Sequence, residues 1–123
     1  MGEEILTGSW RSSSQLEVWD FRSGRRIGEV KWRSGEKDCS IYAAQFSKEG
    51  NGRYILAGGS GANEARVFDH KSNDILVGAP IGCGDSTIVS VDFCEAQPSM
   101  FAVATKASAI HLYDVVDLKT SHK

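Results

Sequence analysis

The chain has 123 residues, of which 41% are hydrophobic and 24% charged, and its formal net charge is −2. These values are typical of at most one soluble globular domain. The weakly acidic balance gives no reason to expect nucleic acid or an anionic membrane as a partner. No hydrophobic run approaches the roughly 20 residues that span a bilayer, and the first residues lack the pattern of a signal peptide.

The residue types that most often bind metals are scattered along the chain. It contains three cysteines, Cys39, Cys83 and Cys94, and three histidines, His70, His111 and His122. None of the cysteines forms a CxxC pair, and their number is odd, so we expect free thiols in a reducing compartment. A zinc site needs closely spaced ligand pairs, which are missing. We therefore expect no metal and no cofactor.

The first third of the chain alternates polar and hydrophobic side chains over short segments, which predicts β-strands. The expected strands cover residues 5–9, 15–21 and 26–32, with a glycine turn over 22–25. Basic side chains gather around the last strand: Arg22, Arg25, Arg26, Lys31 and Arg33. Acidic residues interleave with them, so we expect a solvated outer edge. The alternative is a contact for an acidic protein surface or an RNA backbone.

The rest of the chain continues in the same way. The expected strands cover residues 40–47, 54–57, 64–69, 75–77, 88–93, 101–105 and 110–115. We expect Gly58–Gly61 to form a turn at a strand end, and the residues from Asp117 onward to form a polar tail. No helical period is found, so the predicted fold class is all-β, with ten strands grouped three, four and three.

Pairs of an aromatic residue and an aspartate close one strand in each third of the chain. The pairs are Trp19-Asp20, Phe68-Asp69 and Tyr113-Asp114, and the aspartates stand 49 and 45 residues apart. A second pattern repeats as well, because Ile88, Val91 and Phe93 have the spacing of Ile41, Ala44 and Phe46, 47 residues earlier. Repetition with a period in the forties is typical of propellers and solenoids.

The order of these features resembles the WD-repeat family of β-propellers. A strand ending in phenylalanine, an Ile-Leu-Ala-Gly-like strand and a strand ending in the aromatic-aspartate pair follow one another in the family's order. The segments that match best are Ile5–Ser9, Leu16–Asp20, Phe46-Ser47, Ile55–Gly58, Val67–Asp69, Val91–Phe93 and Leu112–Asp114. The resemblance implies a partial propeller of four-stranded antiparallel blades.

The resemblance also implies blade boundaries. An incomplete first blade covers residues 1–38, a complete second blade covers 39–85, an incomplete third blade covers 86–116, and a flexible tail covers 117–123. The family's Gly-His pairs are absent, and Trp32-Arg33 and Gly82-Cys83 stand near their positions. Propellers need about four to eight blades. The chain is therefore expected to be the end of a larger propeller, or to complete a ring with another copy or another chain, rather than to stand as an open stack.

Three constellations could suggest catalysis or phosphate binding. Asp20, Asp69 and Asp114 recur with the repeat, so we expect them to end strands and bond turn amides. The glycines at 58–61 precede a strand and no helix, which argues against a phosphate loop. The chain has no Gly-x-Ser-x-Gly segment to make a nucleophile of Ser9 or Ser60 beside His111 and Asp114. We therefore expect no enzyme.

Exposed tryptophan and arginine in loops are enriched at binding hot spots. The candidate partner-binding residues are Trp10, Arg11, Trp32 and Arg33. The residues expected to be structural within the blades are Trp19, Asp20, Phe46, Phe68, Asp69, Phe93, Tyr113 and Asp114.

The resemblance implies a non-catalytic scaffold that mediates protein–protein interaction within a larger assembly in the cytoplasm, the nucleus or a cilium. Its implied partners are other protein chains, a second copy, or a chain that completes the ring, with no membrane. The alternatives are a propeller segment that binds RNA or an acidic surface, and a fragment of a propeller hydrolase.

Overall fold

The computed structural model describes residues 3–11, 13–32, 40–48, 52–60, 65–79 and 86–121. These residues form three antiparallel sheets. The first sheet contains β1 (Glu4–Gly8), β2 (Leu16–Asp20) and β3 (Arg26–Glu29). The second contains β4 (Ser40–Phe46), β5 (Tyr54–Ser60), β6 (Ala65–Asp69) and β7 (Ile75–Gly78), with the 3-10 helix η1 (His70–Ser72) before β7. The third contains β8 (Ile88–Phe93), β9 (Met100–Thr105) and β10 (Ile110–Asp114), followed by the helix α1 (Val115–Ser121).

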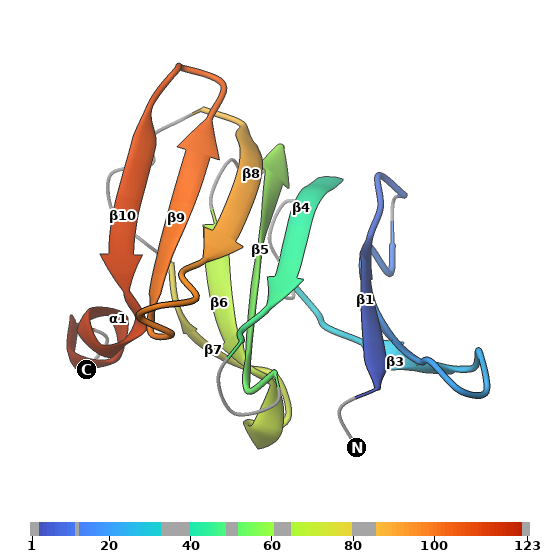
Figure 1. The fold of residues 1–123 in the computed structure, drawn as a ribbon. Helices are drawn as coiled ribbons and strands as arrows, with labels where there is room; N and C mark the ends of the chain where they lie inside the picture. The colour runs from blue at the N-terminus through green and yellow to red at the C-terminus, as the bar shows by residue number, and fades with distance from the viewer. Residues whose placement is uncertain are drawn as a thin grey trace.

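The predicted all-β class is confirmed, and the ten strands of the described residues fall into groups of three, four and three as expected. Within each sheet, strands that follow one another in the sequence are paired, as short turns allow. The sheets stand in chain order across the molecule, with β1 at one side and β10 at the other (Figure 1).

The same aromatic position recurs in the register of all three sheets. Trp19 pairs with Ile5 in the first sheet, and Phe68 pairs with Ile55 in the second. Tyr113 pairs with Phe101 in the third. These three pairs mark equivalent positions in the three sheets, although the surrounding residues differ from sheet to sheet.

Hydrophobic side chains on both faces of the second sheet are buried. On one face, Ile55 and Phe68 pack against Leu16 and Val18 of the first sheet. This contact is the first interface. Each of these side chains is nearly inaccessible to solvent, and full burial of one such side chain stabilises a fold by about 1.5–3 kcal/mol.

On its other face, the second sheet packs against the third. Leu56 and Val67 lie in one hydrophobic cluster with Phe93, Phe101 and Val103 of the third sheet. This contact is the second interface. Phe93 and Phe101 meet edge to face, with their ring centroids 5.8 Å apart, a geometry that aromatic pairs favour. The central sheet therefore joins two separate hydrophobic cores.

Gly58 and Gly59 lie within β5, so the turn expected over 58–61 is wrong for residues 58–60. Gly61 lies outside the described residues. The reason is close packing from two sides. A Cβ on Gly59 would lie 1.7 Å from the carbonyl oxygen of Ser40, and a Cβ on Gly58 would lie 2.8 Å from Cγ2 of Ile88. Glycine is needed here because β4 and β8 approach the strand closely.

The helix α1 replaces much of the polar tail expected from Asp117 onward. It covers Val115–Ser121 and buries Val115 and Leu118 in the cluster of the second interface. The Oδ1 atom of Asp114 accepts a hydrogen bond of 2.9 Å from the amide of Val116 at the start of the helix. The helix packs beside β7 and β10. Seven residues with two buried apolar side chains are too few for a helical period to stand out in the sequence.

Substitution of Gly59 by alanine tests the close approach of β4 and β5. The added methyl group meets the backbone of Ser40, which cannot rotate away. We expect Gly59→Ala to lower the free energy of unfolding by about 1–3 kcal/mol or more, measured by urea denaturation. The matched control is Gly28→Ala, because a Cβ there has nothing within 4 Å. Equal stability of the two variants would contradict this reason for the glycine.

Candidate interaction surface

A β-bulge in β4 places Tyr42 on the surface. The register shifts between Ile41 and Ala43 in this strand, and between Ile88 and Ser90 in β8. A bulge leaves one residue unpaired and re-aims its side chain. Tyr42 is 43% exposed as a result. Val89, which takes the equivalent place in β8, is exposed as well.

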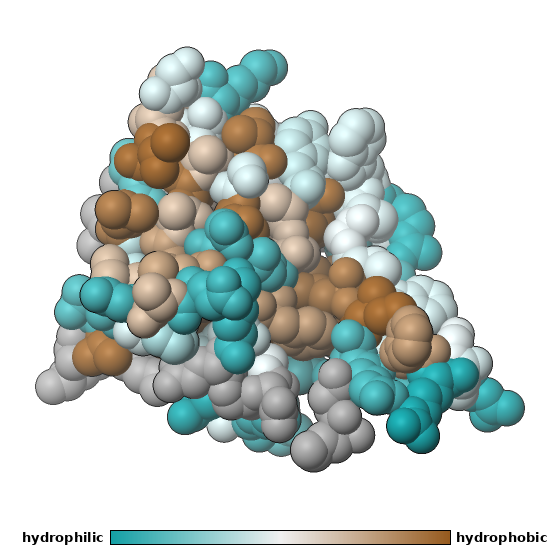
Figure 2. Space-filling model, viewed as in Figure 1, coloured by the Kyte–Doolittle hydropathy of each residue, from teal (hydrophilic) through white to brown (hydrophobic). Residues whose placement is uncertain are grey.

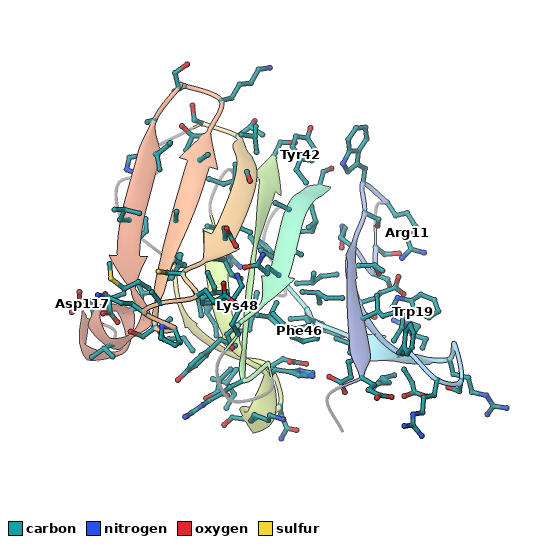
Figure 3. The ribbon with its side chains drawn as sticks, viewed as in Figure 1. Arg11, Trp19, Tyr42, Phe46, Lys48 and Asp117 are labelled. Atoms are coloured by element: carbon teal, nitrogen blue, oxygen red, sulfur yellow. The ribbon has the colours of Figure 1, made fainter. Side chains whose placement is uncertain are left out.

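The aromatic rings of Trp10 and Tyr42 form an exposed pair that joins the first and second sheets. Trp10 follows β1 and is 73% exposed. Its ring centroid lies 5.2 Å from that of Tyr42, at an interplanar angle of 49°. The hydroxyl of Ser60 donates a 3.2 Å hydrogen bond to the phenol oxygen of Tyr42, and Figure 3 shows Tyr42 near the ends of β4 and β5. The pair is thus held in place yet open to solvent.

Arg11 is tied to the first sheet by several contacts. Its guanidinium bonds the carboxylate of Glu17, which is buried, and donates a 2.8 Å hydrogen bond to the carbonyl of Ser14. Arg26 pairs with the other oxygen of Glu17 at 2.7 Å. A buried carboxylate needs such partners. Arg11 therefore covers a buried charge while its own side chain remains half exposed.

Trp32 lies within the packing of the first interface. It is partly buried and packs against the cluster of the first interface. The guanidinium of Arg66 lies 4.7 Å from the centroid of its ring and donates a 2.6 Å hydrogen bond to its carbonyl. The ring of Phe68 lies 5.8 Å away. Arg33 lies outside the described residues. Of the predicted binding residues, Trp10 and Arg11 are thus exposed, whereas Trp32 packs against the core.

The basic run after β2 is paired with acid at several points. Arg22 lies 2.6 Å from Glu3, and Arg26 reaches both Glu17 and Glu29. The pairs of Arg22 with Glu3 and of Arg26 with Glu29 are exposed and contribute little stability. They do leave the edge near β3 close to electrical neutrality, as the interleaved acidic residues predict.

The three repeated aspartates have different partners. Asp20 accepts a 3.0 Å hydrogen bond from the amide of Ser23, and hydrogen bonds from Ser23 lower the pKa of its carboxyl. Asp114 bonds the amide of Val116. Asp69 differs from the expectation, because its side chain makes no capping hydrogen bond to η1 and pairs with Arg53 at 3.3 Å. Two of the three therefore bond amides of the following residues, and the third is held by a cation.

Four of the five expected structural aromatic residues lie in the cores or at their margins. Phe68 and Phe93 are nearly inaccessible to solvent, and Phe46 and Tyr113 pack at the margins of the two clusters. Trp19 is only partly buried, and its indole N–H donates a 3.0 Å hydrogen bond to Thr7.

The structure keeps the possible catalytic residues apart. Ser9 is in contact with Arg11, and Ser60 with Tyr42. His111 lies in the third sheet, where its ring stacks on Tyr113 at 6.2 Å, so the second sheet separates it from Ser9. In the described part of the chain no cluster of histidine, cysteine and acidic residues is placed to hold a metal ion. Cys94 is a free, exposed thiol, and Cys39 and Cys83 lie outside the described residues.

His70 connects the first and second sheets. Its Nδ1 atom lies 2.6 Å from Asp74, and its Nε2 atom lies 2.9 Å from Glu4 of β1. Its ring also lies beside that of Phe46. Burial lowers the pKa of His70, but hydrogen bonds and the charges of Asp74 and Glu4 raise it more, so the pKa lies above its ordinary value. The protonated ring can donate to both carboxylates at once.

Lys48 and Gln45 connect the second and third sheets in a comparable way. Lys48 lies 3.1 Å from Asp92 and donates a 2.8 Å hydrogen bond to the carbonyl of Phe93. The side chain of Gln45 accepts a 2.6 Å hydrogen bond from the amide of Phe93. Hydrogen bonds from Gln45 and Lys48 lower the pKa of Asp92. Polar contacts therefore border both hydrophobic interfaces.

Comparison with known proteins supports the fold and nothing finer. No family model matches the chain, and no curated protein matches it. Among solved structures, the chain is similar to a computationally designed protein named Ika4, with a TM-score of 0.66 and 16% sequence identity. The similarity covers 91% of this chain and 60% of the designed one. In the described residues, no helix has the length and hydrophobicity required to cross a membrane.

Sequence reasoning missed Tyr42 and the role of Glu17. The residues around Tyr42 alternate like a strand, and nothing in that pattern shows the bulge that turns the phenol outward. Glu17 stands between buried Leu16 and Val18. An acidic residue in the middle of an otherwise apolar strand was the available signal that a cation would cover it.

The contact of His70 with Glu4 predicts a pH dependence of stability. A raised pKa in the folded state means that the protonated ring stabilises the fold. This contribution is complete below the unfolded pKa of about 6.5 and is lost as the pH rises through the folded pKa. Urea denaturation should show that the free energy of unfolding of the native chain is lower at pH 8.5 than at pH 6. This difference should be smaller in His70→Gln. His111→Gln, the control, should keep the full difference. An unchanged difference in His70→Gln would show that other groups cause it.

Proposed function

We propose that the chain is a segment of a WD-repeat β-propeller and acts as a non-catalytic scaffold for protein–protein interaction. Support for the propeller comes from three antiparallel sheets that pack face to face in chain order. Further support comes from the aromatic-aspartate pairs that end β2, β6 and β10. On this proposal, the three sheets are an incomplete, a complete and an incomplete blade, and the scaffold works in a larger assembly in the cytoplasm, the nucleus or a cilium.

The observation that carries the interaction role is the exposed Trp10–Tyr42 pair. Two large aromatic side chains that remain in solvent cost hydrophobic free energy unless a partner covers them. The hydroxyl of Ser60 and the packing of two adjacent sheets hold the rings in position, so little conformational entropy would be lost on binding. Tryptophan and tyrosine are the residue types most enriched at hot spots.

Arg11 extends this surface. Its side chain is about half exposed while its guanidinium is fixed by Glu17. Arg11 directly follows Trp10 in the chain, and a fixed guanidinium can bond a carbonyl or carboxylate of a protein partner. The proposed binding surface therefore consists of Trp10, Arg11 and Tyr42, and Arg33 remains a proposed contributor from the sequence.

Binding of RNA is the weaker alternative. Recognition of a phosphate backbone depends on unpaired basic side chains and produces a strong dependence on salt. Arg11, Arg22 and Arg26 each pair with an acidic residue, so they offer less positive potential than their number suggests. No observation of the structure favours a hydrolase.

Alanine substitution at Trp10 and Tyr42 tests the proposed surface. We expect each variant to retain the fold and to lose capture of the protein partners that the native chain retains from a cell extract, with affinity lower by about 30-fold. Quantitative mass spectrometry of the captured proteins measures this loss. Phe21→Ala is the matched control, because Phe21 is an exposed aromatic residue in the turn after β2.

Two results would reject the proposal. If capture of partners is unchanged in all three variants, Trp10→Ala, Tyr42→Ala and Arg33→Ala, then the partners bind elsewhere. Saturable hydrolysis of peptides or phosphoesters by the purified chain would show an enzyme. Salt-dependent binding of RNA at low ionic strength would favour the alternative.

A further inference from the structure

The outermost faces of the first and third sheets are both left uncovered in the single chain. On the third sheet, the outer face of β9 and β10 carries Ala102, Ala104, Ile110 and Leu112, with Ala102 paired to Leu112 and Ala104 to Ile110. On β8, Asp92 stands opposite Ala102 and Ser90 opposite Ala104. Ile110 is 73% exposed and Leu112 is 69% exposed. Figure 2 shows hydrophobic side chains gathered over β9 and β10. An exposed hydrophobic face of this kind usually marks an interaction site.

On β1 and β2, the outer face of the first sheet carries Ile5, Thr7, Glu17 and Trp19. On β3, Glu29 stands opposite Glu17 and Arg26 opposite Trp19. Ile5 pairs with Trp19, and Thr7 pairs with Glu17. Figure 3 shows Trp19 on the side of β1 that is turned away from β4. Glu17 is buried beneath Arg11 and Arg26, so a partner on this face would not leave an unpaired buried charge.

The two internal interfaces show which faces fit together. At the first interface, the paired residues Leu6 and Val18 pack in one cluster with the paired residues Ile55 and Phe68. At the second interface the arrangement repeats one sheet further on. The equivalent residues there are Leu56 and Val67 on the second sheet and Phe101 and Tyr113 on the third.

A contact between a glycine and an isoleucine also repeats at both interfaces. A Cβ on Gly8 would lie 2.4 Å from Cγ2 of Ile41, and a Cβ on Gly58 would lie 2.8 Å from Cγ2 of Ile88. The sheets are therefore stacked with the same orientation, and equivalent faces meet at both interfaces. The outer face of the third sheet corresponds to the face of the first sheet that packs on the second. The outer face of the first sheet corresponds to the face of the second sheet that receives it. The two outer faces are therefore expected to fit together.

We propose that the outer face of the third sheet binds the outer face of the first sheet in a second copy of this chain, head to tail. This proposal rests on the proposed scaffold function and names one partner of it. Ala102 and Leu112 take the places that Leu6 and Val18 have at the first interface, and Ile5 and Trp19 of the second copy take the places of Ile55 and Phe68.

The sizes of the side chains on the two faces are complementary. Ala102 stands where Leu6 and Leu56 stand in the other sheets, so the third sheet has space above it. An open pocket of about 330 Å³ is lined there by Ala102, Leu112, Met100, Phe101 and Asp92, among others. Trp19 is larger than Phe68 and Tyr113 at the same position. The indole ring of the second copy fills the space that the small residue leaves.

Blocking one face at a time tests the proposal. Leu112→Arg places a charge on the outer face of the third sheet, and Ile5→Arg places one on the outer face of the first, both at exposed positions. The native chain should self-associate in sedimentation velocity runs over a wide concentration range. Each variant alone should be monomeric, whereas an equal mixture of the two should form a 1:1 dimer, because one native interface can still form between them.

Ile75→Arg is the control, since Ile75 is 61% exposed in β7 and lies on neither outer face. It should associate like the native chain. Trp19→Ala should raise the dissociation constant by about 30-fold or more. Circular dichroism of every variant should match the native spectrum.

A native chain that remains monomeric at every concentration would overturn the proposal, as would variants that associate alone or fail to associate when mixed. These results leave partner binding at the Trp10–Tyr42 pair untouched, because the two rings pack on one another and lie on neither outer face. Conversely, loss of partner capture on substitution of Trp10 would not affect the association of copies.

Discussion

The structure depends on the burial of the second sheet on both faces. Ile55 and Phe68 point into one core, while Leu56 and Val67 point into the other. Neither flanking sheet has more than three strands within the described residues, and each buries only one of its faces within the chain. The strand alternation of β5 and β6 must therefore serve two cores at once, with apolar residues at most positions and Arg66 and Asp69 as buried charged residues of β6. Sheets covered on both faces commonly have this composition.

Close backbone approach follows from that constraint. Gly8 and Gly58 each accommodate an isoleucine from the next sheet, and Gly59 lies against the chain of β4. Polar residues complete the contacts at the margins, with His70 at the first interface and Lys48 at the second. The interfaces thus have hydrophobic interiors and polar edges, which limits how far one sheet can slide over the next. The same arrangement positions Trp10 beside Tyr42, because the two rings belong to adjacent sheets.

Local pattern was sufficient to predict the strands, because alternation and glycine turns are properties of neighbouring residues. The approximate bounds of β2, β6 and β8 followed from it. Contacts between distant segments were not predictable in this way. The extension of β5 through Gly58–Ser60 depends on Ser40 and Ile88, and Asp69 pairs with Arg53 across two strands. In the candidate surface, the exposure of Trp10 followed from its polar loop, whereas Tyr42 owes its position to a bulge that no sequence pattern revealed.

The position of the second sheet also determines where the molecule opens most easily. Every strand pairing joins segments that are close in the sequence, so the sheets are joined to one another mainly by side chains. The first sheet or the third sheet can separate from the second by losing one interface. In contrast, β5 and β6 become exposed on both faces only when both interfaces are lost. Amide hydrogens of β5 and β6 should therefore exchange with solvent at rates close to those of global unfolding, and those of β3 and β10 through smaller local openings. The single chain is thus expected to have a rigid centre and two edges that fluctuate more freely.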